Sequence, residues 1–505
     1  MKKLLTRVLC FSLLIVIFGI GMSSCERDRI PTVTLLLLGN APTNARHAAA
    51  IERINEITRE RIGAELRTRY IGWADWQTQY QLALASQDPS IDLVITSSTW
   101  LFAWEMVRRG AFYGITPQMM ETYAPVTWAS IPQSTWDIVT DDGFIWFIPE
   151  DQYTQFTNHG MFWRLDWARA GGLYSIDRFE DLETYWEIVR ATQPQAFPWD
   201  ANAGVGIFLI EAYIMGRRPV QTIVGTATGN FAIFQYYTHD PFTVVSYFMN
   251  GDELVEVAEI LHRWGQRGFW REDVLNYHGD TRNMLLSGHS GSDQHHTHTF
   301  LNLREQMDRE QPGSELQMFW IGKENNNVNR NLRTHGAMAI NAASRNPRKA
   351  LQMYDLLRND REIYILYNFG IEGIDYIEDS PGVFSLPPGF NQFTDALDGN
   401  FWGGRRDDFE PEWTHWWNGR NDFVEHLNTF AMDYPLENFS FDGSRVAAEM
   451  AAIGDVCARF LPAIHFGKTA DPVQAVADFR IALRQAGFDR VKDELQSQLN
   501  ALRDR

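Results

Sequence analysis

Residues 31–39, PTVTLLLLG, form a continuous apolar and β-branched run ending at glycine, which predicts a strand buried on both faces. Beyond it, isoleucines recur at helical spacing and further apolar runs follow. These patterns predict a helix over 44–63, a strand over 64–72, a helix over 73–87 and a strand over 91–97. Because strands and helices alternate, we expect an α/β fold with a parallel sheet covered by helices.

In parallel sheets, ligands bind at the carboxyl ends of the strands. Three segments follow predicted strands and are therefore candidate ligand loops: Gly39–Thr43, Gly72–Trp76 and Thr96–Trp100. The polar segment 322–331, GKENNNVNRN, is predicted to be a solvated loop.

The carboxyl-terminal part of the chain has a helical pattern. Asp471 is placed to cap a helix, Pro472 suits its first turn, and Gly487 is placed to end it. The predicted apolar face of this helix consists of Val473, Val476, Phe479 and Leu483. The remaining residues, to 505, predict a last amphipathic helix.

The chain begins with a basic stretch, MKKLLTR, and then an apolar run, Val8–Ile20, that is shorter than the roughly 20 residues needed to span a bilayer. This pattern predicts a secretory signal. Met22–Cys25 resembles a bacterial lipobox, which predicts a lipoprotein signal peptide over 1–24, acylation of Cys25 with chains such as palmitate, and a tether over 25–30. The alternative is an ordinary cleavable signal with an incidental cysteine.

Cysteine content and charge narrow the class of protein. Cys10 would leave with the signal and Cys25 would be acylated, so Cys457 remains as a single free thiol, predicted to be a small buried residue. Removing the signal and its three positive charges takes the formal charge from −19 to −22. Such a charge disfavours nucleic acid as a partner, because phosphates need a basic face.

Several segments together resemble the solute-binding lipoproteins of bacterial ABC importers, the family that includes maltodextrin-binding protein. In chain order these segments are DLVITSSTWLFAWEMVRRGAFYGIT, DDGFIWFIPED, GMFWRLDWARAGGLYSIDRFEDLETYWEIVRATQP and HGAMAINAASRNPRKALQMYDLL. Three more, NFGIEGIDY, GNFWGG and AGFDRVKDELQSQL, resemble a large-bodied subfamily of these lipoproteins.

The resemblance implies a two-lobe, periplasmic-binding-protein-like α/β fold with hinge crossovers and a helical carboxyl-terminal extension. The implied first lobe is 31–149 with 315–365, and the implied second lobe is 150–314 with 366–505. The hinge candidates are Pro149–Gln152 and Gln311–Glu315.

The chain contains 18 tryptophans, and indole rings stack on the flat C–H faces of sugars. Trp73, Trp76 and Trp100 lie at predicted strand ends, where they would be platforms for a sugar or would fill the space between helices and sheet. At the same edge, Ser97 and Ser98 would donate to a ligand hydroxyl or cap a helix.

The resemblance adds Asp151 and Tyr153, where family members often offer an acid and an aromatic ring. It also places His289 and Asp293 in a segment that leads to the cleft edge. The neighbouring histidines 295, 296 and 298 lack a recognisable ligand spacing, so no metal is predicted.

Trp402 and Arg405 lie on a glycine-rich loop that can approach a ligand closely. Arg405 would bind vicinal hydroxyls or a carboxylate through its planar guanidinium. Equally, it would form a surface salt bridge with Asp407 or Asp408.

The leading hypothesis is an extracytoplasmic solute-binding lipoprotein of an ABC importer, anchored by lipid to the bacterial cell membrane. As a monomer without a cofactor, it would capture an oligosaccharide or sugar derivative between its lobes and deliver it to the transmembrane permease subunits. One alternative is a surface-anchored glycan-degrading enzyme, which would need two carboxyl groups facing each other across the bond. A sensory binding lipoprotein is the other. No Asp-x-Asp/Asn-x-Asp/Asn-Gly calcium loop is present in the sequence.

Overall fold

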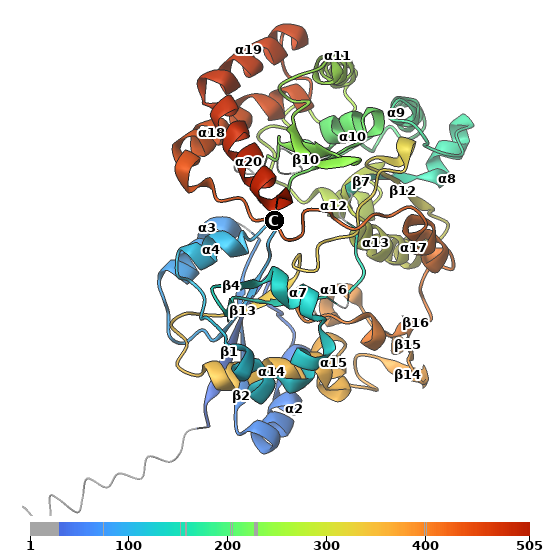
Figure 1. The fold of residues 1–505 in the computed structure, drawn as a ribbon. Coiled ribbons are helices and arrows are strands. Elements are labelled where there is room, and N and C mark those ends of the chain that lie inside the picture. The colour runs from blue at the N-terminus through green and yellow to red at the C-terminus, as the bar shows by residue number, and fades with distance from the viewer. Residues whose placement is uncertain are drawn as a thin grey trace, which may run out of the picture.

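The computed structural model describes residues 30–73, 75–151, 153–156, 159–202, 204, 206–226, 231–397, 399 and 401–504. They form two α/β lobes, one above the other in Figure 1. The predicted signal peptide and the predicted lipidation site Cys25 lie outside the described residues. Within the described part of the chain, every helix is too short or too polar to cross a bilayer.

The first lobe is built on a five-stranded sheet. Its strands, in spatial order, are β2 (Glu65–Ile71), β1 (Thr32–Leu38), β3 (Leu93–Thr96), β13 (Ala337–Ile340) and β6 (Ile148–Pro149). β1 pairs in parallel with β2 and β3, as the sequence predicts, and its residues from Val33 to Leu38 are buried. β13 enters from much later in the chain and is antiparallel to both of its neighbours.

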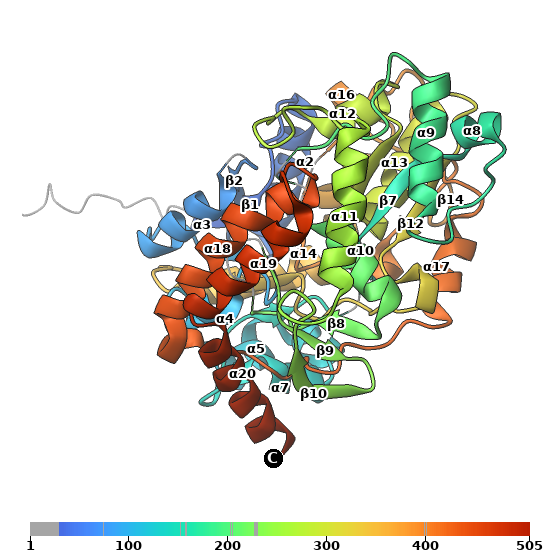
Figure 2. The same cartoon turned by 90° about the horizontal axis from the view of Figure 1, so that it is seen from above.

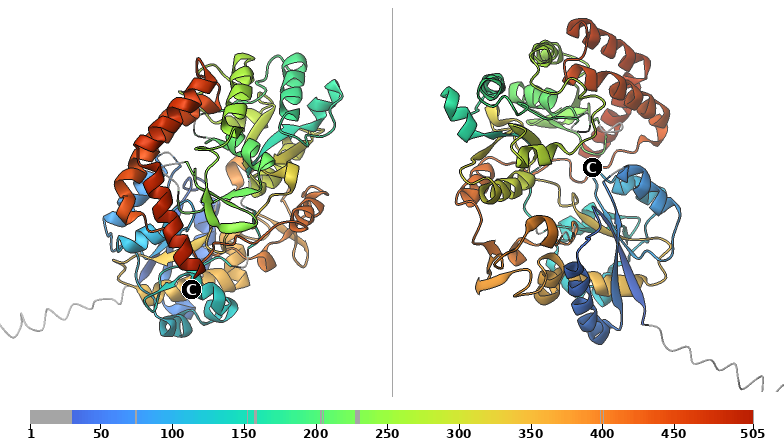
Figure 3. Two further views of the ribbon diagram at one scale, coloured as in Figure 1. Left: turned by 45° about the horizontal axis from the view of Figure 1, so that its top comes forward. Right: turned by 180° about the vertical axis from the view of Figure 1, so that it is seen from behind.

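Helices surround this sheet, with a short hairpin of β4 (Thr140–Asp141) and β5 (Phe144–Ile145) beside it. The helices are α2 (Ala45–Ile62), α3 (Trp76–Ala85), α4 (Ala103–Arg108), α5 (Pro117–Tyr123), α6 (Pro125–Ser130), α7 (Gln133–Ile138), α14 (Pro347–Asn359) and α15 (Arg361–Asn368). The right panel of Figure 3 shows the sheet with helices beside it.

A small sheet extends the first lobe around α15. It consists of β14 (Ile377–Ser380), β15 (Val383–Ser385) and β16 (Glu412–Trp413), with α16 (Gln392–Asp395) between β15 and β16. Tyr364 of α15 and Phe384 of β15 share one apolar cluster, and Phe401 is buried in the core of the first lobe. The first lobe therefore continues well past residue 366, whereas the resemblance implies that the second lobe resumes at that residue.

The second lobe contains two three-stranded sheets. Their strands are β11 (Ser292–His296), β7 (His159–Arg164) and β12 (Leu316–Trp320) in one, and β10 (Asp240–Val245), β9 (Gln235–Tyr237) and β8 (Val220–Thr222) in the other. The helices around them are α8 (Leu165–Ala168), α9 (Asp181–Thr192), α10 (Phe208–Arg217), α11 (Glu253–Gln266), α12 (Thr281–Leu286), α13 (Thr297–Glu310) and α17 (Arg420–Asn428).

Three carboxyl-terminal helices complete the second lobe: α18 (Ala447–His465), α19 (Pro472–Gln485) and α20 (Phe488–Arg503). Figure 2 shows α18 and α19 near α11, while α20 runs down toward β10, and the apolar faces of all three join the same core. Asp471 caps α19 by accepting from the Gln474 amide, and Gly487, with φ 95°, separates α19 from α20, as predicted. Val473 is an exception, because it is 46% exposed while the other three predicted face residues are buried.

Among the described residues, the chain crosses between the lobes three times, after β6, after β12 and after β16. The first crossing follows Pro149, the last residue of β6, which pairs with β13 in the first sheet. The second was predicted at Gln311–Glu315, but β12 pairs with β7 in the second lobe, so this crossing runs over 321–336. The sequence of β12 is an apolar run that would suit the sheet of either lobe, and no local sequence signal distinguishes the two lobes.

The prediction that 322–331 is a solvated loop is wrong for two asparagines in the second crossing. Asn327 and Asn329 are buried in it, and their side-chain amides donate to the Val220 carbonyl at 2.8 Å and to the Tyr236 hydroxyl at 2.9 Å. These asparagines are buried because each amide finds a partner on the second sheet of the second lobe. A run of asparagines in the sequence does not reveal those partners.

Candidate ligand site between the lobes

Four tryptophans gather at one edge of the first lobe and form what we call the tryptophan cluster: Trp73, Trp76, Trp100 and Trp402. The rings of Trp73 and Trp402 are stacked with centroids 5.5 Å apart. Trp76 and Trp100 meet edge to face at 5.2 Å. Trp73 is 43% exposed and the others are half-buried, so the cluster offers apolar ring surface to solvent.

The order of strands in the sheet explains this gathering. Trp73 follows β2 and Trp100 follows β3, and both strands flank β1 in parallel, so their carboxyl ends meet at one edge. The predicted helix from residue 73 begins only at Trp76, because Asp75 before it is left-handed with φ 54°. Trp73 is thereby left in a loop rather than in the helix.

Trp402 joins the cluster through the glycine that follows it. Gly403 has φ 118°, and a Cβ there would lie 2.5 Å from the Ala337 carbonyl oxygen at the start of β13. Because glycine lets the loop approach the sheet this closely, Trp402 reaches the ends of β2 and β3.

The loop after β3 is held by hydroxyl contacts to the second crossing. Ser97 is buried, with its hydroxyl 2.8 Å from that of Thr99 and accepting from the Thr99 amide. The Thr99 hydroxyl lies 2.9 Å from Nδ1 of His335, and the Ser98 amide donates to the Thr334 carbonyl at 3.0 Å. The predicted alternative, capping of the following helix by these serines, is wrong, since α4 has no side-chain cap.

Arg405 is the centre of a second group of contacts. Its Nε donates to Glu150 Oε1 at 2.6 Å, and its guanidinium lies 3.9 Å from the centre of the Tyr153 ring. The Tyr153 hydroxyl in turn contacts Nε2 of His298 on α13 of the second lobe. The predicted salt bridge of Arg405 with Asp407 or Asp408 is therefore wrong; Arg406 pairs with Asp408 instead. This chain of contacts links the two lobes.

Histidines line the end of the second lobe that faces the crossings. His159 begins β7 and His296 ends the antiparallel β11 beside it, while the ring of His295 stacks on that of His159 at 5.1 Å. Burial lowers the pKa of His159 and holds the pKa values of His295 and His296 well below the ordinary value. These rings are therefore neutral at neutral pH.

The other two histidines at this boundary are also neutral. Burial lowers the pKa of His298 to about 3, and that of His335 to about 4 against the opposing effect of the Glu150 carboxylate. Neutral imidazole has one donor and one acceptor, which suits contact with hydroxyl groups.

Three predicted site residues lie elsewhere. Asp151, at φ 50°, accepts from the Thr135 hydroxyl at 2.9 Å and so faces α7 of the first lobe. Asp293 is buried in the middle of β11 and pairs with Arg282 at 3.2 Å. His289 is exposed before β11, at the end of the strand away from the crossings.

A cavity of about 560 Å³ lies between the lobes beside the loop after β3. Its first-lobe wall includes Gln77 of α3, Ser98 and Trp104 of α4, and its second-lobe wall includes Val224 and Phe439. Ser98 lines this cavity and lies on the same loop as Trp100, while the four tryptophans of the cluster are not among the residues that line it. The volume suits a small part of an oligosaccharide.

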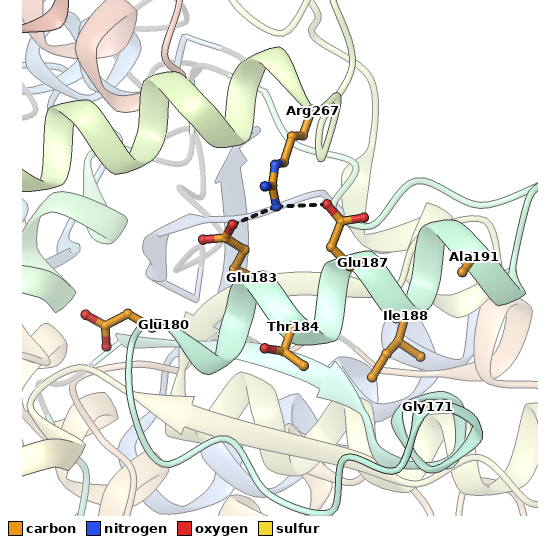
Figure 4. A pocket seen from close by; sticks show the side chains of 8 residues that line it. All are labelled: Gly171, Glu180, Glu183, Thr184, Glu187, Ile188, Ala191 and Arg267. Atoms are coloured by element: carbon orange, nitrogen blue, oxygen red, sulfur yellow. Dashed lines mark hydrogen bonds and ion pairs between the residues drawn. The ribbon is translucent and has the colours of Figure 1, made fainter.

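A hollow of about 540 Å³ lies outside the cleft, on α9 (Figure 4). Figure 4 shows Arg267 between Glu183 and Glu187, with contacts of 2.7 and 3.1 Å. The charges of these three side chains therefore satisfy one another at the surface. Among the described residues, no set of three histidine, cysteine, aspartate or glutamate side chains is arranged to hold a metal ion.

The chain is similar to known proteins over nearly its whole length. A carbohydrate ABC transporter substrate-binding protein of Streptococcus pneumoniae serotype 4 is 20% identical, covering 95% of this chain and 92% of its own. Residues 435–504, which include α18 to α20, match a domain of unknown function, DUF3502.

Solved structures share the fold. The N-glycan transport solute binding protein NgtS of S. pneumoniae, in complex with Man1GlcNAc, has a TM-score of 0.73 at 18% identity, covering 93% of this chain and 99% of that one. The S. pneumoniae ABC-transporter substrate binding protein FusA, an EF-hand mutant in complex with fructo-nystose, has a TM-score of 0.66 at 12% identity, covering 94% and 99%. The chain thus has the two-lobe solute-binding-protein fold, and the predicted resemblance to the solute-binding proteins of ABC importers is confirmed.

Proposed function

We propose that the protein is the extracytoplasmic solute-binding component of an ABC importer, and that it captures an oligosaccharide between its lobes. The tryptophan cluster is the observation that carries this proposal. Four indole rings at the carboxyl edge of the first sheet, one of them 43% exposed, provide the apolar surface on which sugar rings stack.

The residues proposed to contact the ligand are those that the fold brings to this edge. They are Trp73, Trp76, Trp100 and Trp402, together with Ser98 at the cavity, and Tyr153 and Arg405 at the first crossing. Asp151 is left out because its side chain faces α7, and Asp293 because it pairs with Arg282. His289 is left out because it lies before β11, at the end of that strand away from the crossings. Ser97 is left out because its hydroxyl is buried and bonded within its own loop.

Delivery to permease subunits and a lipid anchor at Cys25 complete the proposal. The related carbohydrate ABC transporter substrate-binding protein and the Met22–Cys25 sequence support these two points. We propose a monomer that does no chemistry on its ligand; the related proteins are substrate-binding proteins, and Glu150 at the crossing is paired with Arg405, which supports this proposal.

Isothermal titration calorimetry on residues 26–505 tests the proposal, with neutral mannose-, N-acetylglucosamine- and fructose-containing oligosaccharides as probes. We expect one of these classes to bind and to be recovered uncut. Trp73→Ala and Trp402→Ala should each weaken binding at least tenfold. Trp167→Ala, which removes a half-buried tryptophan from α8 at the outer end of the second lobe, is the matched control and should bind like the wild type. Cleavage of the bound sugar would point to an enzyme instead.

A further inference from the structure

Five of the chain's 13 histidines meet at the boundary between the lobes. We call this group the histidine cluster: His159, His295, His296, His298 and His335. Its members come from β7, β11, α13 and the second crossing, so the fold rather than the local sequence assembles them. Ring centroids of His295 and His296 are 4.3 Å apart, and those of His159 and His296 are 5.9 Å apart.

The histidine cluster lies next to the proposed ligand site. His335 contacts Thr99, the residue before Trp100, and His298 contacts Tyr153, on which Arg405 packs. All five histidines are half-buried as residues rather than fully enclosed in a core.

The charged groups around the histidine cluster are already paired. Three arginines raise the electrostatic potential at the rings, and each has a carboxylate partner within 3.2 Å: Arg405 with Glu150, Arg282 with Asp293, and Arg420 with Glu305. The described residues that face the rings therefore leave no cation free to neutralise an anionic ligand.

The rings themselves do not supply that charge at neutral pH. With a pKa of about 4, His335 carries a proton in about one molecule in a thousand at pH 7. Neighbouring rings oppose protonation further, because His159, His295, His298 and His335 all act to lower the pKa of His296. A buried carboxylate without a partner is unfavourable, and the formal charge of −19 adds a repulsive field.

We infer that the histidine cluster is a specificity-determining part of the ligand site, binding the hydroxyls of a neutral glycan and rejecting glycans that carry uronic or sialic acids. This inference rests on the proposed function and narrows its ligand class. Uncharged imidazoles match hydroxyls, which also donate and accept, whereas a carboxylate could use only the N–H donors, would face the acceptor nitrogens without a proton to donate, and would find cations that are already paired.

The test compares two ligands that differ only at one C6 position, where a hydroxymethyl group is replaced by a carboxylate. A neutral oligosaccharide that binds residues 26–505 is oxidised at one C6 hydroxyl to the uronate, and both are titrated at pH 7.5. We expect the uronate to bind at least 100-fold more weakly. Equal or tighter binding of the uronate overturns the inference while leaving the proposed function intact. Absence of binding by every neutral and acidic glycan tested overturns both.

Substitutions locate the selectivity. His159→Arg and His335→Arg, made separately so that a folding defect in one does not decide the result, should each reduce the preference for the neutral ligand at least tenfold. His239→Arg is the matched control, because His239 is exposed beside Tyr237 and away from the histidine cluster. An unchanged preference in folded variants of both cluster residues would assign the selectivity elsewhere and overturn the inference.

Discussion

Glu150 and Arg405 form a two-point ion pair between the first crossing and the glycine-rich loop. Arg405 donates to Glu150 Oε1 from Nε at 2.6 Å and to Oε2 from Nη2 at 3.1 Å, and the two side chains are 17% and 6% exposed, respectively. The pair connects Trp402 and its loop to the point where the chain leaves the first lobe.

Replacing Glu150 should therefore destabilise the protein. Glu150→Gln leaves the Arg405 cation buried without its counter-charge, and we expect a loss of about 3–5 kcal/mol in the free energy of unfolding. Urea denaturation measures it. Glu315→Gln is the matched control, because the Arg169–Glu315 pair lies at the surface, and it should change stability by less than about 1 kcal/mol. A loss of that small size in Glu150→Gln would show that the Arg405 charge is solvated.

Arg358 gives a second prediction about the first crossing. It is fully buried, and its guanidinium donates to the carbonyl oxygens of Pro149 at 2.8 Å and Glu150 at 2.9 Å. Arg358→Met leaves both carbonyls without this donor, at about 1–3 kcal/mol for each buried group. Arg361→Met, at an arginine with a 51% exposed side chain on α15, should have little effect on urea denaturation. Similar stabilities for the two variants would contradict this account.

Gly403 is predicted to tolerate no side chain. Gly403→Ala adds a Cβ that meets backbone atoms of Ala337 at 2.5 Å, at a φ of 118° that L-residues avoid, so we expect a loss of at least about 1–3 kcal/mol. Gly443→Ala is the control, because the nearest atom to its Cβ, on Phe441, is 3.5 Å away. Thermal denaturation compares the two, and the prediction is wrong if the Gly403 variant is as stable as the Gly443 variant. Weaker glycan binding should accompany the change at 403, since Trp402 would be displaced.

His465 makes stability depend on pH. It is fully buried near the end of α18, its Nε2 accepts from the Leu209 amide at 3.2 Å, and burial lowers its pKa from 6.5 to about 3. The unfolded chain therefore binds the proton more tightly than the folded protein. The resulting stability is complete above pH 6.5 and is lost progressively as the pH falls toward 3, with about 2 kcal/mol lost between pH 7 and pH 5 from this group.

Urea denaturation at pH 7 and pH 5 tests this dependence in the wild type and in His465→Gln. Glutamine accepts the same hydrogen bond without titrating, so the variant should lose about 2 kcal/mol less than the wild type over this interval. Equal losses in the two proteins would assign the pH dependence to other groups. His239→Gln, at an exposed position, should follow the wild type.

The sequence predicts the first three strands and the last two helices closely because their signals are local. An unbroken apolar run marks β1, and the cap at Asp471 and the stop at Gly487 mark α19. The three tryptophans at the sheet edge follow from strand order alone. Trp402 joins them through a contact of Gly403 with β13, which periodicity does not encode.

What the sequence does not predict depends on partners far away in the chain. The sequence predicts the second crossing too early in the chain. The apolar sequence of β12 would suit the sheet of either lobe, and only its pairing with β7 assigns it to the second lobe. The local sequence predicts that Asn327 is solvated, but in the fold its side-chain amide is buried and donates to the Val220 carbonyl. The histidine cluster had one weak signal, the run at 295–298, but His159 and His335 join it only through the crossings.

The position of β13 between β3 and β6 has a consequence for the order of folding. The first sheet cannot close until residue 340 has been synthesised, and the second lobe's core waits for α18 to α20 at the end of the chain. Neither lobe is encoded by a continuous segment, so pairings distant in sequence must form late and folding should be slow. For the exported protein proposed here, this delay would keep the nascent chain unfolded long enough to be threaded through a membrane.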